Sequence, residues 1–490
     1  MEAKQITSFA VDGEAVKKER VIPVTEEADE PRHLESGVIN LYPEMEYQTI
    51  EGFGGALTDT SAYLYAQMDT ATKKQFLEDY FGKKGQGYRF LRMHIDSCDF
   101  SLEEYQAVAD PIADPDFATF TIDRDKKYMI PMLKDAMAMT AQPFSILLSP
   151  WSPPFQWKTP PEAPKNDASV YGASFLANFM PPVDYERPQR NNGGKLRKEH
   201  YDDWARYLAK YVNAYLDEGL PVTMMSLQNE TIAATNWDSC VWTAAEQKEF
   251  LQNYLYPTFK EAGLVGKVGL YIWDHNKERV YEFAKEVLDN ETRNMLEGIA
   301  FHWYSGDHFE GLSLAHDAFP DMKLMSSECC PLHAPGQGNM LAAFLGGGMS
   351  PAEVDYQDAV DYAHDIIGDL NHGMNRWIDW NLCVDEQGGP RHVPMGFGAS
   401  VYAKADGTYK KLLIFDYIGH FSRYIHPDAV RIGFSKCDDK VEITAAKNQN
   451  GELVLVALNK GASAASYAIR LNGHVIRVEF PAKTISTVLI

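Results

Sequence analysis

Short apolar runs alternate with segments of helical period along most of this chain. The most informative run covers residues 222–230, which are apolar without alternation and close on Asn229 and Glu230. Such a run predicts a strand that is buried on both faces and carries polar side chains at its carboxyl end. Residues 201–218 give the clearest helix, with one apolar stripe of period 3.6 that stops at Gly219.

Eight runs of the strand type alternate with helix-like segments, which is the pattern of a parallel sheet wrapped in helices. We therefore predict a closed (β/α)8 barrel, the TIM-barrel fold of the α/β class. A first helix is expected over residues 59–81. The expected strands lie within residues 48–60, 88–96, 144–148, 222–227, 267–273, 298–304, 323–327 and 375–381.

A glycine-rich segment follows the start of the first expected strand. Gly52, Gly54 and Gly55 have the spacing of a nucleotide-binding loop, but Leu57 stands where the third glycine of G-x-G-x-x-G is required. The motif therefore fails. We interpret the glycines as a tight turn from strand to loop.

The two chain ends differ from the centre. Residues 1–49 are extended, rich in Val, Glu and Pro, and have no helical period. Residues 429–490 have the pattern of short strands separated by turns. With 490 residues, of which 45% are hydrophobic, the chain is long enough for one large catalytic unit and a smaller one.

Charge narrows the range of partners. The 46 basic and 69 acidic residues give a formal net charge of −23, which repels phosphate backbones and anionic lipid. Nucleic acid is therefore not an expected partner. The chain has no run of eighteen apolar residues and no apolar core of a secretory signal at its start, so we expect a cytoplasmic protein without stable membrane insertion. A homodimer stays open.

The six cysteines show no C-x-x-C pair, and their wide spacing gives no disulfide framework. We interpret them as mostly buried thiols. The adjacent Cys329 and Cys330 could instead form a ligand pair or a redox pair, but no zinc signature supports that alternative.

Polar and aromatic side chains gather at the carboxyl ends of the expected strands, where a (β/α)8 barrel keeps its active site. One glutamate at a strand end is most often an ion-pair or capping group, and one buried histidine is usually a satisfied core group. Two glutamates ringed by Trp, Asn, His and Arg form a set that chance rarely produces. The set comprises Arg92, His94, Asp96, Asp99, Trp151, Asn229, Glu230, His302, Tyr304, Glu328, Trp380 and Asn381.

This mixture favours the cleavage of glycosidic bonds. Sugars stack their C–H faces on indole rings and pair their hydroxyls with polar side chains, and two carboxylates cut the bond. We interpret Glu328 as the nucleophile, with a pKa lowered by Arg92. Glu230 would be the acid/base that keeps its proton among aromatic rings and beside the anionic Glu328. A retaining enzyme then requires the two carboxyl groups to lie roughly 5 Å apart.

Motifs that run through nearly the whole chain support this interpretation. They are GFGGALTD (52–59), SCDFS (97–101), SPWSPP (149–154), QNE (228–230), HWY (302–304), SECC (327–330), DWNL (379–382) and GHFSRYI (419–425). With them the sequence resembles glycoside hydrolase family 30, near its glucosylceramidase group. The resemblance implies that Glu230 is the acid/base and Glu328 the nucleophile, and that neither a metal ion nor an organic cofactor takes part.

The same resemblance extends to the substrate site and to the domains. It implies a closing helix over residues 409–424 and a β-sandwich domain built from both chain termini. Residues 1–49 and 426–490 would form that sandwich, and residues 50–425 would form the barrel. Asp99, Trp151, Asn229, Trp380 and Asn381 would hold the sugar, while Arg92, His302 and Tyr304 would surround the carboxylates.

Three features depart from the family pattern or leave choices open. Thr231 stands where the family usually has Pro, so the loop after the fourth strand could differ in shape. Residues 155–200 form a Pro-, Asn- and Gly-rich insertion that either walls the leaving-group side of the site or is disordered. Trp237 and Trp242 either stack on the leaving group or pack in the core.

The substrate is the least determined property. We expect exo-cleavage of a terminal β-glucoside from a small or oligosaccharide β-glycoside, and glucosylceramide-like activity stays open. A β-xylosidase or a β-1,6-glucanase is the alternative within the family. A non-catalytic glycan-binding barrel would not need both glutamates, and a metal-dependent hydrolase would need more ligands than His94 and Asp96.

Overall fold

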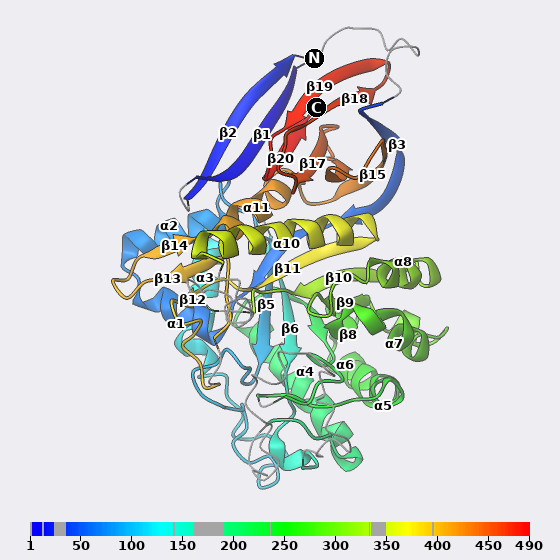
Figure 1. Cartoon of the computed structure of the whole chain (residues 1–490). Coiled ribbons are helices and arrows are strands. Elements are labelled where there is room, and N and C mark those ends of the chain that lie inside the picture. Colours follow the sequence, from blue (N-terminus) through cyan, green and yellow to red (C-terminus); the bar gives the residue numbers. More distant parts are fainter. Residues whose placement is uncertain are drawn as a thin grey trace.

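Eight parallel strands close into a barrel (Figure 1). The computed structural model describes residues 2–11, 14–23, 36–140, 143–160, 191–235, 237–332, 334, 349–393 and 396–490. Each strand pairs with its neighbour in the chain and β11 closes the ring on β4, so the (β/α)8 barrel and its eight expected strands are confirmed. The strands are β4 (Gly52–Ala56), β5 (Phe90–Ile95), β6 (Ser145–Pro150), β7 (Val222–Ser226), β8 (Gly269–Asn276), β9 (Gly298–His302), β10 (Lys323–Glu328) and β11 (Met374–Asn381).

The barrel interior is filled by side chains and is not a pore. One residue from each of seven strands joins a buried cluster that comprises Phe90, Leu147, Met224, Tyr271, Ala300, Met325 and Ile378. The remaining strand, β4, contributes glycines. A Cβ atom on Gly54 would lie 2.1 Å from the carbonyl oxygen of Phe90, so only glycine allows β4 and β5 to approach this closely. The glycines therefore lie within a strand, and the predicted strand-to-loop turn is wrong.

Two expected helices have different bounds in the structure. The segment 59–81 is two helices, α1 (Asp59–Gln67) and α2 (Thr70–Phe81), because the Asp69 side chain accepts from the Thr72 backbone N–H and starts a new helix. The closing helix is shorter than residues 409–424. Its first residues form the strand β14 (Tyr409–Lys411), and α11 (Leu413–Ser422) follows.

The expected helix over residues 201–218 is confirmed as α4 (Tyr201–Asp217), whose aromatic stripe is buried. A π-helical turn at Leu251–Leu255 joins α5 and α6. A small sheet of β12 (Val384–Asp385), β13 (Val401–Ala403) and β14 follows the barrel. The other helices are α3 (Met129–Met139), α5 (Ala244–Phe250), α6 (Tyr256–Glu261), α7 (Val280–Val287), α8 (Phe309–Ala318) and α10 (Pro351–Asn371).

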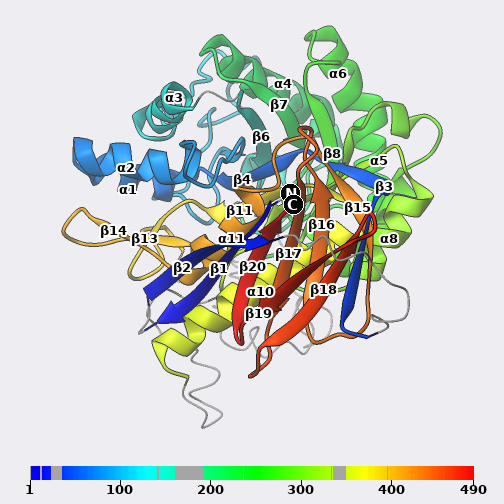
Figure 2. The same cartoon turned by 90° about the horizontal axis from the view of Figure 1, so that it is seen from above.

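Both chain ends enter one nine-stranded sheet with its own hydrophobic core (Figure 2). Its order is β19-β18-β3-β15-β16-β17-β20-β1-β2, so strands from the first 50 residues lie at two separate places among the carboxyl-terminal ones. The strands are β1 (Glu2–Val11), β2 (Glu14–Pro23), β3 (Val38–Ile50), β15 (Ala429–Lys436), β16 (Glu442–Lys447), β17 (Leu453–Asn459), β18 (Ala465–Leu471), β19 (His474–Phe480) and β20 (Thr484–Leu489).

Helices α10 and α11 lie between the barrel strands and this sheet (Figure 1). Asn371 of α10 donates to the carbonyl oxygen of Ile443 in β16 (2.9 Å). His420 of α11 contacts Thr487 of β20 and Ser8 of β1 through its two ring nitrogens, each at 2.8 Å. The barrel and the sheet are thus joined by buried polar contacts as well as by apolar packing.

Five cysteines are buried thiols and Cys437 is exposed, as expected for cysteines without a disulfide framework. Among the residues that the structure describes, no helix is long and apolar enough to cross a membrane.

Candidate active site

Arg92 of β5 lies at the centre of the polar residues that the barrel gathers. Its buried guanidinium donates to Ser149 Oγ (3.1 Å) and Asn229 Oδ1 (2.7 Å). It also forms ion pairs with Asp274 Oδ2 (2.9 Å) and Glu328 Oε2 (2.5 Å). A buried cation is stable only with such partners, since an unpaired charge inside a protein is strongly unfavourable. One side chain therefore links the carboxyl ends of β6, β7, β8 and β10.

Glu328, the last residue of β10, has both carboxylate oxygens occupied by donors. Arg92 binds Oε2, and the Tyr304 hydroxyl donates to Oε1 at 2.9 Å. The Tyr304 oxygen also lies 3.3 Å from Cys330 Sγ. The expected contact of Arg92 with Glu328 is present, and two donors from different strands hold the carboxylate in one orientation.

Glu230 follows β7 in a backbone conformation that is rare for residues other than glycine, with a φ of 48°. Its backbone N–H donates to the carbonyl oxygen of Asp274 (2.8 Å). Its side-chain Oε1 lies 3.6 Å from Nδ1 of His275 and 3.6 Å from Nδ1 of His302. The backbone bond to β8 thus holds the carboxylate between two imidazoles.

The two imidazoles change the proton balance at Glu230. Burial acts to raise the pKa of Glu230, but His275 and His302 outweigh burial and hold this pKa below its usual range. Burial acts to lower the pKa of His302, but Glu328, Asp274 and Glu230 together raise it to about 9. These opposite shifts favour a proton on His302, whereas the sequence predicted that Glu230 keeps its proton until it is needed. The difference arises because imidazoles, and not only aromatic rings, lie against the carboxylate.

Trp151 and Trp380 form an aromatic wall beside Arg92. Their rings are stacked with centroids 5.3 Å apart and planes at 24°. The Arg92 guanidinium lies 4.8 Å from the Trp151 centroid and 5.4 Å from that of Trp380, so cation–π contacts hold both rings in place. Indole faces of this kind are the surface on which a sugar ring stacks.

Asp99 lies near Glu230 and Glu328, whereas Asn381 makes a contact that supports the fold. Burial, together with the charges of Glu328 and Glu230, raises the pKa of Asp99 to about 7. Asn381 Oδ1 accepts from the Thr58 hydroxyl (2.6 Å), which caps α1, and its Nδ2 is buried without a hydrogen-bond partner. The contact with Thr58 gives Asn381 a structural role that the sequence did not indicate.

His94 and Asp96, the two candidate ligands for a metal-dependent hydrolase, both form hydrogen bonds with other residues of the protein. His94 Nε2 accepts from the Asp59 backbone N–H (3.1 Å). Both Asp96 oxygens accept from the Tyr207 hydroxyl of α4, at 2.8 and 2.7 Å. This pair therefore supports the packing of α1 and α4 against β5.

The loop after β7 is joined to β8 by Thr231. Its side chain is fully buried, and its hydroxyl donates to the carbonyl oxygen of Trp273 (2.5 Å). Trp237 joins the buried cluster that contains Trp151 and Trp380, whereas Trp242 packs in the core. Of the two alternatives for these tryptophans, core packing thus applies to Trp242.

Residues 161–190 of the expected insertion lie outside the described residues, and a role for them in the site stays a prediction. The described part before them ends near Lys158, whose ammonium group is buried. Lys158 donates to Ser152 Oγ (2.8 Å) and to the carbonyl oxygens of Asn191 (2.7 Å) and Ser239 (2.6 Å). This lysine therefore joins the loops after β6 and β7.

Sequence reasoning missed two residues of the site, Asp274 and His275. Both lie near the carboxyl end of β8, directly after the expected strand at residues 267–273. Asp274 Oδ1 accepts from the Ser327 hydroxyl (2.5 Å) and contacts His302 Nε2 (3.1 Å). The available signal was the same one used for the other strands, namely a polar pair that closes an apolar run.

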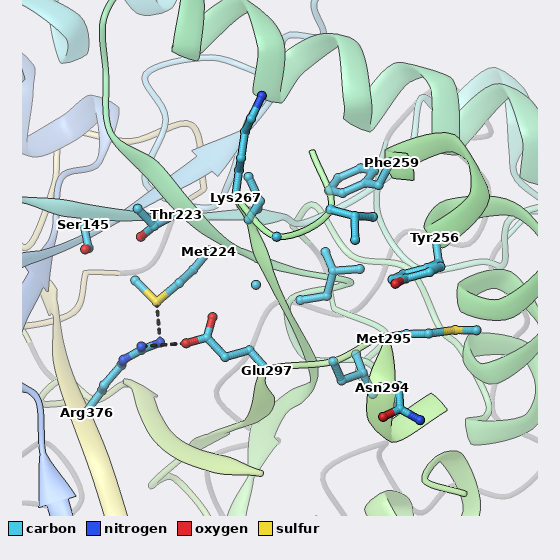
Figure 3. A pocket seen from close by; sticks show the side chains of 16 residues that line it. Ser145, Thr223, Met224, Tyr256, Phe259, Lys267, Asn294, Met295, Glu297 and Arg376 are labelled. Atoms are coloured by element: carbon cyan, nitrogen blue, oxygen red, sulfur yellow. Dashed lines mark hydrogen bonds and ion pairs between the residues drawn. The ribbon is translucent and has the colours of Figure 1, made fainter. Parts of the chain in front are cut away.

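Two hollows lie near the barrel. One of about 340 Å³ borders Tyr304 and Cys330 and is also lined by Trp303, Leu332 and Val354. The other, of about 460 Å³ (Figure 3), is lined by residues at the amino ends of the barrel strands, whereas Glu230 and Glu328 lie at their carboxyl ends. Its Arg376 is already paired with Glu297 and Glu51.

Comparison with known families matches two segments of the chain. Residues 50–174 and 189–425 match the glycosyl hydrolase family 30 TIM-barrel domain, and residues 428–488 match the glycosyl hydrolase family 30 beta sandwich domain. The matched barrel segments exclude residues 175–188, which belong to the insertion after β6.

Individual proteins are similar over most of the chain. The lysosomal acid glucosylceramidase of Mus musculus is 28% identical over 86% of this chain and 77% of its own length. An endo-1,6-beta-D-glucanase of Aspergillus fumigatus is 24% identical over 78% of this chain and 72% of its own length. The crystal structure of SrfJ from Salmonella typhimurium is 30% identical, with a TM-score of 0.85 over 100% of this chain and 99% of that one.

Proposed function

This chain belongs to glycoside hydrolase family 30, and we propose that it is a retaining, exo-acting β-glycosidase that removes a terminal β-D-glucosyl residue. One observation carries the proposal. Glu230 and Glu328 lie at the same end of the barrel, and a continuous series of polar contacts through His302, Asp274 and Arg92 joins them. Two carboxylates at the carboxyl ends of barrel strands are what double displacement requires.

In the first step a Glu328 oxygen attacks the anomeric carbon and the bond to the leaving oxygen breaks. Glu230 takes up the proton held by His302 and gives it to that oxygen, so the leaving group departs as an alcohol. Arg92 and Tyr304 hold the attacking carboxylate in place during this step, which supports Glu328 as the nucleophile.

In the second step water attacks the anomeric carbon of the glycosyl-enzyme. Glu230 takes a proton from the water, and the ester bond to Glu328 breaks, so that the sugar leaves with its original configuration. Trp151, Trp380, Asn229 and Asp99 border the carboxylates, and we propose that they hold the sugar in both steps. Asn381 completes the set proposed from the sequence, although its contact with Thr58 favours a supporting role.

The choice of glucose as the sugar rests on similarity. A relative with the name glucosylceramidase matches most of the chain, which supports a β-glucoside with either a soluble or a lipid leaving group. The hollow beside Tyr304 combines apolar walls from Trp303, Leu332 and Val354 with the polar side chains of Gln357, Asp358 and Asp361, so it is compatible with a leaving group of either kind. An endo-acting β-1,6-glucanase is the second candidate, because a relative with that name also matches, and a β-xylosidase stays a third.

A substrate panel tests the sugar and the mode of cleavage. Aryl β-glucoside, aryl β-xyloside, a fluorescent glucosylceramide and a β-1,6-glucan are compared by kcat/KM. We expect the aryl β-glucoside or glucosylceramide to be the best substrate and the glucan to be cut only from its end. Release of internal oligosaccharides from the glucan would instead establish the endo-acting alternative.

Glu328→Gln tests the mechanism. Loss of the nucleophile should reduce kcat by about 10⁴-fold or more, since such groups act as a unit with the rest of the site. Proton NMR of the first product of the native enzyme should show the β-anomer. A first product with the α-anomer, or a variant with native activity, would overturn the retaining mechanism.

A further inference from the structure

Three atoms that commonly bind metal ions face one another at the carboxyl ends of β7, β8 and β9. They are Glu230 Oε1, His275 Nδ1 and His302 Nδ1, and all lie within 4.8 Å of one another. Each histidine nitrogen lies 3.6 Å from the glutamate oxygen. In a tetrahedral zinc site with bonds of about 2.0–2.1 Å, neighbouring ligand atoms lie about 3.4 Å apart. The two measured separations are therefore within a few tenths of an ångström of zinc geometry.

The two histidine nitrogens have no other partner. The side chains of His275 and His302 are 7% and 0% exposed. Both Nδ1 atoms are buried and make no hydrogen bond. Both nitrogens lie beyond hydrogen-bond distance of the Glu230 oxygen that they face, so an ion that displaces the proton of His302 would satisfy all three atoms at once. The rings are 79° apart in orientation and reach the oxygen from two different strands.

The surroundings of His302 match those of a metal ligand. Its second ring nitrogen, Nε2, lies 3.1 Å from Asp274 Oδ1. Metal-binding histidines usually donate their second N–H to a carboxylate, which fixes the ring and leaves the other nitrogen free for the metal. The Ser327 hydroxyl in turn holds Asp274 (2.5 Å).

The charge around the three atoms favours a cation. Glu230, Glu328 and Asp274 contribute three carboxyl groups around the guanidinium of Arg92 and the imidazole of His302. The Glu230 side chain is 13% exposed, so it is not sealed from solvent. One glutamate, two histidines and one position left for water form the ligand set of an open zinc site.

We propose that Glu230, His275 and His302 bind Zn²⁺ and that the bound ion inhibits the enzyme. The ion binds the Glu230 carboxylate, which would otherwise exchange a proton with the leaving group. The ion is therefore an inhibitor and not a reactant. Binding stands on the geometry of the three side chains. Inhibition also rests on the proposed role of Glu230 as the acid/base.

The other group of possible ligands among the described residues supplies a control. It comprises Glu104, Asp238 and His392. That group has a single histidine, and His392 Nδ1 contacts the carbonyl oxygen of Ser101 (2.9 Å), so only Nε2, which lies 3.2 Å from Asp238 Oδ2, faces the carboxylates. We therefore expect no tight zinc binding at this group.

Direct binding tests the site without any substrate. The metal-free full chain is titrated with Zn²⁺ by calorimetry and with Co²⁺ by visible absorption, where a tetrahedral site gives intense bands. We expect one ion per chain. His275→Asn and Glu230→Gln should each weaken binding by at least about tenfold, since each removes a direct ligand. Circular dichroism and melting curves identify any variant that fails to fold. If one of the two variants fails to fold, the zinc affinity of the other one tests the site.

His392→Asn is the matched control and should leave the affinity unchanged. Hydrolysis of an aryl β-glucoside should fall in proportion to the fraction of protein with bound Zn²⁺, and a chelator should restore it. Absence of binding up to millimolar Zn²⁺, or binding that His392→Asn removes and His275→Asn keeps, would overturn the zinc site. If zinc binds as expected but no glycoside is hydrolysed, the proposed function fails while the site stands.

Discussion

At the scale of single residues, the site depends on which side chains lie against each carboxylate. Glu328 has a guanidinium and a phenol as neighbours, whereas Glu230 has two imidazoles. The two carboxylates are chemically identical, so their proposed roles, nucleophilic attack for Glu328 and proton exchange for Glu230, rest on their different surroundings. Two predictions follow from these contacts.

Glu230→Ala should reduce kcat/KM for a substrate with a poor leaving group, such as a methyl β-glucoside, by about 10²- to 10⁴-fold. A dinitrophenyl β-glucoside needs no proton to depart, so its first step should slow far less. Azide, added as a small nucleophile, should restore turnover and give the β-glycosyl azide. Equal losses for both substrates would contradict the role of Glu230 as the acid.

Tyr304→Phe should reduce kcat/KM by about 10- to 100-fold, because a hydrogen bond to a charged group contributes roughly 1.5–3 kcal/mol. The variant removes the donor to Glu328 Oε1 and also the contact with Cys330. Cys330→Ala removes only the second contact and serves as the matched control. If the two variants lost activity equally, the hydrogen bond to Glu328 would not be the cause.

At the scale of elements, an irregularity near the end of β8 determines the shape of the site. Consecutive residues of a regular strand point to opposite faces, yet Asp274 and His275 both contact active-site residues. The pairing of β8 with β9 shifts between Trp273 and His275, and Trp273 and Asp274 have φ values of 72° and 49°. Such a bulge turns a side chain toward the other face, so two consecutive residues can serve the same site.

Thr231→Val tests how this irregular segment is held. The change keeps the shape of the side chain but removes the hydroxyl that donates to the Trp273 carbonyl oxygen. We expect a loss of about 1–3 kcal/mol in the free energy of unfolding, measured by denaturant titration, together with a lower kcat. Thr235→Val is the control, because the Thr235 hydroxyl bonds to Trp237 within its own loop. It should have the smaller effect on kcat.

At the scale of the whole molecule, the barrel and the nine-stranded sheet are joined through α10 and α11. His364 of α10 lies between Glu442 of β16 (2.6 Å) and Asp307 of the barrel (3.2 Å). The division of the chain at residues 50 and 425, the homodimer and the cytoplasmic location stay predictions. The sheet itself shares no described contact with the carboxylates, so we assign it a supporting role.

His364→Gln should lower the melting temperature at neutral and acidic pH but not at alkaline pH. The hydrogen bond and charge of Glu442 raise the pKa of His364 to about 9, above its unfolded value near 6.5. The stabilisation is therefore fully present below pH 6.5 and is lost as the pH rises through 9. Because the group is partly exposed, we expect the melting temperature to fall by only about 1–2 °C at pH 6.

At pH 9.5 the variant and the native protein should melt together. His474→Gln, at an exposed position of β19, is the control and should show no dependence on pH. If the difference in melting temperature between His364→Gln and the native protein stayed constant from pH 6 to pH 9.5, the charge of His364 would not be its cause.

The sequence by itself determined the barrel strands and their order, and it predicted Glu230 and Glu328 as the carboxylate pair. Residues 222–230 identify β7 because burial on both faces leaves an apolar run, and Glu230 stands out because a carboxylate directly follows that run. Family motifs then indicated roles for Glu328 and its neighbours. These features are local in the chain, so they can be recognised without knowing which strands meet.

Only the tertiary structure decided which side chains touch. Closure of the barrel brings His275 and His302 against Glu230, and Asp274 against Arg92, although these residues are far apart in the sequence. The proton balance at Glu230 depends on those contacts, because a charge within a few ångströms shifts a pKa more than any local sequence feature. The division of the segment 59–81 into two helices depends on the cap at Asp69, and the bulge in β8 depends on its pairing with β9. Neither can be predicted from the spacing of apolar residues.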